Sequence, residues 1–182
     1  MAQKTKSTSS VLFVAIIILL SLGILDALFL TYLHLSPDSS RFCGAGEFNC
    51  DIVNKGAYST LDGVSYFLVM DLGVSAPIID LASRNWVLNL LLSNAFLGTI
   101  TLVIVLFLVI CFKKEKHIGE LSPAGMLRLV RWLLFIGVLY GTYLFYIQKA
   151  ILKTYCLYCL ILDGILLGSL ALVMLLNGKE RT

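Results

Sequence analysis

The hydrophobic and polar positions of the chain form four long apolar runs separated by polar, turn-rich segments. Each run is long enough to cross a bilayer as a helix, which takes about 20 residues. Only a few residues join the last two runs, so these helices are expected to lie antiparallel. The pattern predicts an all-α membrane protein built as an antiparallel four-helix transmembrane bundle. The predicted spans are about 11–35, 88–112, 127–151 and 154–176.

The first apolar run has the length of a transmembrane helix rather than of a cleavable signal peptide. A signal peptide has a shorter apolar region followed by a small-residue cleavage site, and neither feature is present. We therefore interpret residues 11–35 as a retained span.

Residues 36–87 are expected to form an outer loop and a cap. The part up to about Leu61 is polar, whereas Asp62 to Ser83 is apolar but interrupted by aspartates, glycines and a proline. A carboxylate at mid-bilayer costs about 2.5–3.5 kcal/mol, so a full span is not expected here. We predict an interfacial half-helix lying on the bundle, within a single domain that covers residues 1–182.

The composition supports a membrane protein. The chain is 59% hydrophobic and 14% charged, whereas soluble domains carry about 25% charged residues. The net charge of +3 is too small to indicate nucleic-acid binding.

The basic residues predict the orientation in the membrane. Four spans place both termini on one side, and nine of the fourteen basic residues fall on that side. Lys and Arg are enriched in cytoplasmic segments, so both termini are expected in the cytoplasm. The nine are Lys4, Lys6, Lys113, Lys114, Lys116, Arg128, Arg131, Lys179 and Arg181.

Four of the five cysteines then lie on the extracytoplasmic side, in two pairs. Cys43 and Cys50 are in the first outer loop, and Cys156 and Cys159 open the last span. Cys111 lies alone at the opposite membrane face. Both cysteine pairs are thus expected on the same side of the membrane, which electron transfer between them requires.

The C-x-x-C pair has the spacing of a redox couple. Residues three apart share one face of a helix, and their separation is compatible with a disulfide. A helix N-terminus favours a thiolate on the first cysteine, Cys156. The alternative is that Cys156 and Cys159 serve only as small apolar residues.

The loop pair has two alternatives of its own. Cys43 and Cys50 could form a structural disulfide that fixes the outer loop. A zinc site is less favoured because such sites usually combine two C-x-x-C motifs, and here six residues separate the pair. His34 and His117 are not expected nearby, so no metal is predicted.

Two carboxylates fall within the predicted spans at similar depth. Asp26 lies about nine residues from the outer end of the first span, and Asp163 lies one helical turn beyond Cys159. Ionisable residues inside a membrane usually face the bundle interior. They are candidates for a proton relay, since a buried protonatable group beside a redox cysteine can supply protons when electron transfer is coupled to proton uptake. The alternative is a pair of structural polar groups that tie two helices together.

These features resemble the vitamin K epoxide reductase family, including its prokaryotic members. The resemblance runs from about Gly23 to Leu175. It rests on the order and spacing of the two cysteine pairs, CDIVNKGAYST after Cys50, SNAFLG at the second span and CLYC at the last.

The resemblance implies a role for each matched position. Cys159 would face the quinone, Cys156 would form its resting disulfide and exchange with Cys50, and Cys43 would meet a thioredoxin-fold partner. Asn94 and Tyr58 match the family's quinone-contacting asparagine and the aromatic after the loop pair, and Asp163 is a further candidate for contact with the quinone. The quinone (menaquinone, ubiquinone or vitamin K type) is a substrate, and the cap would cover its site.

Two positions depart from the family pattern. Gly56 replaces a common serine, and Asp163 replaces the tyrosine of the animal enzymes. The second departure favours plain quinone over vitamin K epoxide as the acceptor. No fused thioredoxin-like domain follows, so the partner is expected in trans.

The function expected from the resemblance is reoxidation of an extracytoplasmic thioredoxin-fold protein of the DsbA type, with electrons passed to a membrane quinone. Two alternatives remain open. One is an animal-type vitamin K epoxide or quinone reductase. The other is a non-enzymatic membrane scaffold with structural disulfides.

Overall fold

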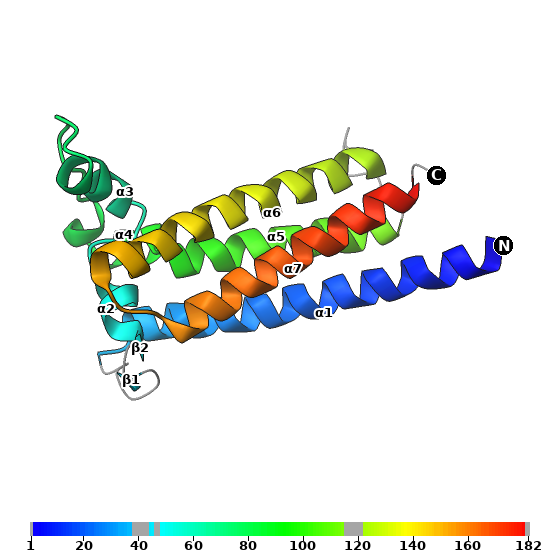
Figure 1. Cartoon of the computed structure of the whole chain (residues 1–182), viewed down its shortest axis with the longest axis horizontal. Coiled ribbons are helices and arrows are strands. Elements are labelled where there is room, and N and C mark those ends of the chain that lie inside the picture. The colour runs from blue at the N-terminus through cyan, green and yellow to red at the C-terminus, as the bar shows by residue number, and fades with distance from the viewer. Residues whose placement is uncertain (1, 38–43, 46–47, 115–121, 181–182) are drawn as a thin grey trace.

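Four helices in the described part of the chain are long and apolar enough to cross a membrane (Figure 1). The computed structural model describes residues 2–37, 44–45, 48–114 and 122–180. The four helices are α1 (Ala2–Leu35), α5 (Asn94–Lys113), α6 (Pro123–Tyr146) and α7 (Leu157–Glu180).

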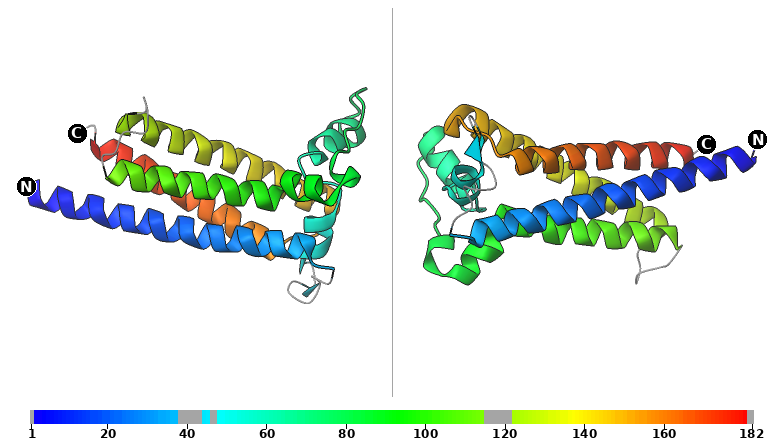
Figure 2. Two further views of the ribbon diagram at one scale, coloured as in Figure 1. Left: turned by 180° about the vertical axis from the view of Figure 1, so that it is seen from behind. Right: turned by 90° about the horizontal axis from the view of Figure 1, so that it is seen from below.

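The long helices form a four-sided bundle. α1 packs against α5 and α7, and α6 packs against the same two helices. Successive long helices run in opposite directions, so both chain ends lie at one end of the bundle (Figures 1 and 2). Interlocking apolar side chains hold the helices together, as expected where lipid removes the hydrophobic driving force. The fully buried side chains include Ile16, Leu20, Val105, Met126, Val130 and Val173.

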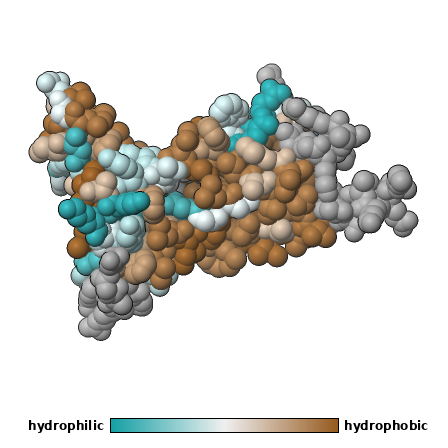
Figure 3. Space-filling model, in the orientation of Figure 1, coloured by the Kyte–Doolittle hydropathy of each residue, from teal (hydrophilic) through white to brown (hydrophobic). Residues whose placement is uncertain are grey.

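The side of the bundle that Figure 3 shows is apolar on its outer surface as well. Leu25, Phe107, Ile136 and Leu175 are each more than half exposed, at 64%, 56%, 58% and 59%. Apolar surface costs about 25 cal/mol per Å² in water, whereas lipid tails solvate it. The chain is therefore a multi-pass helical membrane protein, as its composition predicts.

The second span begins six residues later than expected. The apolar run is broken at Ser93 into α4 (Trp86–Leu92) and α5. Ser93 is fully buried, its hydroxyl accepts a hydrogen bond from Phe96 N, and its backbone pairs with Thr60. This N-cap ends α4 and starts α5 in a new direction. The expectation of one helix from Leu88 was wrong because the pairing with Thr60 comes from a distant segment.

The other two boundaries shift for local reasons. α6 begins at Pro123 rather than Leu127, since Ser122 caps it and proline suits the first helical position. It continues through a π-helical turn, η4 (Ile147–Leu152). α7 begins at Leu157 rather than Thr154, because the intervening residues make the turn between the two helices.

The end of the bundle opposite the termini carries the short elements. Strands β1 (Gly44–Ala45) and β2 (Phe48–Asn49) pair antiparallel, and α2 (Cys50–Lys55) follows them directly.

A buried polar junction fixes α2 on the end of α1. His34 Nδ1 donates to the carbonyl of Asn54 at 2.5 Å, and its Nε2 lies 2.5 Å from Asn89 Oδ1 on α4. The Asn54 amide in turn donates to the carbonyl of Leu30 at 2.7 Å. Buried polar groups are costly unless paired, so these bonds specify one position for α2 and thus for Cys50, its first residue.

The cap is shorter and less regular than a half-helix over 62–83. α3 (Gly63–Tyr66) continues into the π-helical turn η2 (Phe67–Asp71), and an irregular segment leads to η3 (Ala82–Arg84). Asp62 is buried and accepts hydrogen bonds from the amides of Leu81 and Ala82, both at 2.7 Å. The cap formed by α3, η2 and η3 projects sideways from the end of the bundle that carries α2 (Figure 1).

Candidate functional site

The turn between α6 and α7 is built around Gln148. Lys153 adopts a left-handed conformation with φ 51° and ends the helix. The Gln148 carbonyl accepts from the amides of Lys153 and Thr154, and its side-chain Oε1 accepts from the amide of Cys156 at 2.7 Å. The buried residue Gln148 therefore fixes the turn between α6 and α7 and the position of Cys156, the first residue of the C-x-x-C motif.

The two cysteine regions meet at this turn. Phe48 pairs with Tyr155, and the amide of Asn49 donates to the carbonyl of Tyr155 at 2.9 Å. Each paired segment leads directly into a fully buried cysteine, Cys50 in one and Cys156 in the other.

Cys50 and Cys156 belong to one small apolar cluster, which also contains Leu30 and Ala95 and against which Cys159 packs. Cys50 is disulfide-bonded, whereas Cys156 and Cys159 are free thiols. Cys43 lies outside the described residues. The structure therefore brings three of the four predicted redox cysteines together.

The local hydrogen bonds favour a thiolate at Cys156. The hydrogen bond with the Cys159 side chain is the largest effect and lowers the pKa of Cys156, and backbone N–H groups add to it. The Cys159 amide lies 3.3 Å from the Cys156 sulfur. Burial and the negative charge of Asp26 oppose the shift and raise the pKa. The net lowering makes Cys156 a better leaving group in exchange.

We expect the ultraviolet absorbance of the reduced protein to show one thiolate that forms below the ordinary cysteine range. Since its folded pKa lies below the unfolded value, this thiolate stabilises the folded reduced protein above the ordinary cysteine pKa. That stabilisation is lost as pH falls through the lowered value. Replacing Cys156 by alanine should remove the early titration, and Cys111→Ala is the control. An early titration that persists without Cys156 would contradict this assignment.

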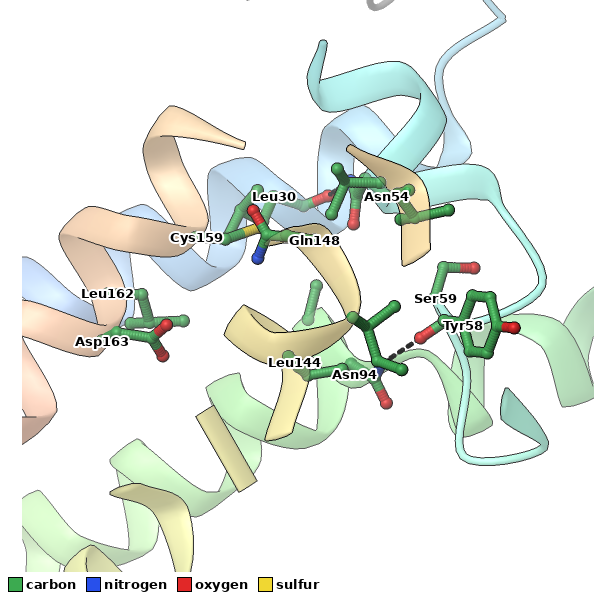
Figure 4. Close-up of a pocket in the computed structure, with 14 residues that line it drawn as sticks. Leu30, Asn54, Tyr58, Ser59, Asn94, Leu144, Gln148, Cys159, Leu162 and Asp163 are labelled. Carbon is green, nitrogen blue, oxygen red and sulfur yellow. Dashed lines mark hydrogen bonds between the residues drawn. The ribbon is translucent and has the colours of Figure 1, made fainter. Parts of the chain in front are cut away.

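A cavity lies directly beneath Cys159 (Figure 4). Its volume is about 70 Å³, and four of the predicted site residues line it: Tyr58, Asn94, Cys159 and Asp163. Cys156 is not part of its wall. The C-x-x-C motif therefore presents one sulfur to the cavity and buries the other beside Cys50.

The cavity continues into an apolar groove of about 360 Å³ between α5, α6 and α7. The two share Asn94, Leu144, Leu162 and Asp163. Ligand pockets usually measure about 300–1,000 Å³ and are mostly apolar with a few polar groups. Cavity and groove together reach that size, with the thiol at the polar end.

Asn94 is held at both ends of its amide. Its Nδ2 donates to the carbonyl of Tyr58 at 2.8 Å, and its Oδ1 accepts from the Tyr140 hydroxyl at 2.8 Å. Its backbone amide donates to the carbonyl of Ser59. These bonds orient Asn94 rigidly, with one amide hydrogen left for a ligand.

Tyr58 contributes its backbone and one wall of the cavity, whereas its hydroxyl points away. The hydroxyl donates to Asp71 Oδ2 in the cap at 2.8 Å. Burial, followed by this hydrogen bond, raises the pKa of Tyr58 to about 12. The side chain therefore stays protonated and links the cap to the cavity wall.

Asp163 reaches the cavity because α6 has a glycine opposite it. A Cβ at Gly141 would lie 2.3 Å from Asp163 Oδ1, so only glycine leaves room for this carboxylate. Asp26 approaches the same region from α1, and its charge acts on Cys156. The Asp26 Oδ2 atom is buried and has no hydrogen-bond partner among the described residues.

Gly56 has a steric reason to differ from the serine of the resembling family. It closes α2, and a Cβ at this position would lie 2.6 Å from the carbonyl oxygen of Ile52. No side chain fits there without moving the end of the helix. The departure therefore reflects the tight end of α2 in this chain.

The sequence interpretation missed two polar residues of the site, Gln148 and Tyr140. Each is a polar side chain in an otherwise apolar span, which by itself points to the bundle interior. Their partners are Cys156 and Asn94, which are distant in sequence.

No three His, Cys, Asp or Glu side chains within the described ranges gather as metal ligands. The chain matches the model of the Vitamin K epoxide reductase family over residues 14–174. The comparison with curated proteins gives no match.

Proposed function

The chain belongs to the vitamin K epoxide reductase family of membrane oxidoreductases, and we propose that it oxidises an extracytoplasmic thioredoxin-fold protein and passes the electrons to a membrane quinone. The observation that carries the proposal is the position of the C-x-x-C motif. Cys156 is buried with Cys50, while Cys159 lines the cavity.

Electrons enter through the loop pair in this proposal. The dithiol of the partner reduces the disulfide between Cys43 and Cys50 and leaves as a disulfide. Cys50 then attacks the Cys156 sulfur of the Cys156–Cys159 disulfide, and Cys159 departs as a thiolate. Cys43 resolves the mixed disulfide, so two electrons and two protons have moved to the C-x-x-C pair.

The quinone receives the electrons in the second half of the cycle. Its ring occupies the cavity beneath Cys159, and its apolar tail lies in the groove between α5, α6 and α7. Cys156 and Cys159 return to a disulfide as the quinone takes up two electrons and two protons to become a quinol. Asp163, in the cavity wall, and Asp26, beside the thiols, are the candidate proton donors.

The proposed orientation places the thiols outside the cytoplasm. α5 ends at Lys113, next to Lys114, and α6 begins at Pro123 and carries Arg128 and Arg131 in its first turns, so these basic residues belong to the end of the bundle with the chain termini. Basic residues concentrate at cytoplasmic ends of spans, which supports cytoplasmic termini. The extracytoplasmic side is also the compartment in which proteins acquire disulfides.

We expect the purified protein to reduce short-chain ubiquinone or a naphthoquinone when a reduced thioredoxin-fold protein is supplied. Quinone absorbance and the thiol content of the partner should change in a one-to-one ratio of quinol to disulfide. The same assay with vitamin K epoxide tests the animal-type reaction, which the carboxylate at Asp163 disfavours. If the cysteines react neither with quinone nor with the reduced partner, the result would support a structural scaffold and contradict the proposed oxidoreductase function.

A further inference from the structure

Gln148 is a buried amide whose nitrogen has no hydrogen-bond partner among the described residues. The side chain is 1% exposed, and burying an unpaired amide is costly. Its Oε1 accepts from Cys156 N, but its amide nitrogen makes no hydrogen bond with the described residues. The nitrogen is directed into the cavity beside Cys159, as Figure 4 shows.

The orientation of this amide follows from hydrogen-bond chemistry. A backbone N–H can only donate, so the Gln148 atom 2.7 Å from Cys156 N must be the oxygen. The NH₂ group therefore faces the cavity. The π-helical turn η4 supplies the local geometry, and such turns are frequent at functional sites.

Asn94, Asn54 and Tyr58, three other polar residues of the cavity wall, already use side-chain donors within the protein. Asn94 already uses one amide hydrogen and its oxygen on Tyr58 and Tyr140. The amide of Asn54 donates to Leu30, and the hydroxyl of Tyr58 donates to Asp71. Gln148 has both amide hydrogens available, and it lines the same cavity as the reacting sulfur of Cys159.

We propose that the Gln148 amide binds a carbonyl oxygen of the quinone beside Cys159. The inference rests on the proposed function and names a contact that the family resemblance does not supply. The carbonyl oxygen gains negative charge as electrons arrive, so the hydrogen bond strengthens during reduction. The same side chain holds Cys156 N, and Gln148 therefore sets the distance between quinone and C-x-x-C motif.

Two substitutions separate the donor from the acceptor of this amide. Gln148→Met removes both functions at similar size. Gln148→Glu keeps an oxygen for Cys156 N but can donate to the quinone only when protonated. Lys149→Ala, an exposed position in the same turn, is the matched control. The readouts are the quinone KM, the equilibrium Kd of labelled short-chain quinone, and the rate of exchange with the reduced partner.

We expect Gln148→Met to raise the quinone KM and Kd roughly tenfold, the equivalent of one hydrogen bond. Gln148→Glu should show the same increase at high pH and approach the original values as pH falls. With its carboxyl protonated, the Glu variant should exchange with the thiol partner at close to the parent rate, since Cys156 N keeps an acceptor. Asp163 also titrates in the cavity wall, so the parent is measured over the same pH range. A merely structural role for Gln148 would give the Glu variant the same pH dependence of quinone affinity as the parent.

Two results would overturn the contact. One is an unchanged quinone KM and Kd in both variants. The other combines two observations: thiol exchange is slower in Gln148→Met, and Gln148→Glu keeps the original quinone affinity at every pH. That combination would mean that Gln148 only holds Cys156 in place. A parent protein that binds quinone without reducing it would contradict the proposed function, while the Kd values would still test the contact.

Discussion

Replacing Cys159 by alanine is expected to lower quinone reduction by roughly three orders of magnitude or more, as loss of a reacting group does in other enzymes. Cys159 is the cysteine that lines the cavity, so its loss removes the sulfur nearest the quinone. The protein should still fold, because Cys159 packs only at the edge of the cluster that contains Cys50 and Cys156.

The same substitution should trap an intermediate. Without Cys159, the Cys156 thiolate can attack Cys50 of the Cys43–Cys50 disulfide and expel Cys43 as a thiolate, and no Cys159 sulfur remains to displace Cys50 from Cys156 in turn. Cys50 and Cys156 lie in the same buried cluster. A disulfide between Cys50 and Cys156 is expected to accumulate and to be found by peptide mass spectrometry. Cys111→Ala, which alters a buried cysteine at the far end of α5, should neither trap this species nor reduce turnover. Normal quinone reduction by Cys159→Ala would refute the proposed electron path.

Replacing Gly141 by alanine is expected to disturb both the stability of the bundle and the position of Asp163. The new Cβ would lie 2.3 Å from Asp163 Oδ1 and 3.1 Å from its Cγ, so the carboxylate must leave its place. Overpacking of this kind costs about 1–3 kcal/mol. Thermal unfolding of the purified protein should show a clear decrease in Tm, together with weaker quinone turnover.

A second substitution tests the cause of that decrease. Asp163→Ala removes the atoms that a Cβ at Gly141 would meet, so the double variant should be more stable than Gly141→Ala alone. Gly164→Ala is the control, since no atom lies within 4 Å of its added Cβ. Additive effects of Gly141→Ala and Asp163→Ala would show that the two residues do not compete for this space.

The four spans were predictable because lipid imposes a simple requirement. The bilayer core offers no water to polar groups, so most side chains of a span are apolar and the apolar runs are long and continuous. The break at Ser93 was not predictable from the same pattern, because the run continues through it without a charge, a proline or a glycine. It depends on the pairing with Thr60, a contact that hydropathy does not encode.

The grouping of Cys50, Cys156, Cys159 and Asp163 was predictable because motif spacing and depth place them near one another, whereas Asn94 was implied by the family resemblance. The hydrogen-bond partners were not, since each joins residues from different helices. Tyr140 on α6 holds Asn94 on α5, and Gln148 holds the start of α7. A single sequence shows the residue types but not which of their polar atoms remain free.

The division of the C-x-x-C motif between a buried sulfur and a cavity-lining sulfur has an electrochemical consequence. In the proposed electron path, the first turn of α7 joins two redox couples. One is the loop cysteine pair, which is reduced from the water side, and the other is the quinone, which comes from the lipid. Electrons on this path pass between the two couples only through the cysteine sulfurs, because Cys156 has no exposed surface. In the proposed electron path, dissolved oxidants and thiols therefore do not act at Cys156, and the potential of the quinone pool reaches the loop cysteines alone.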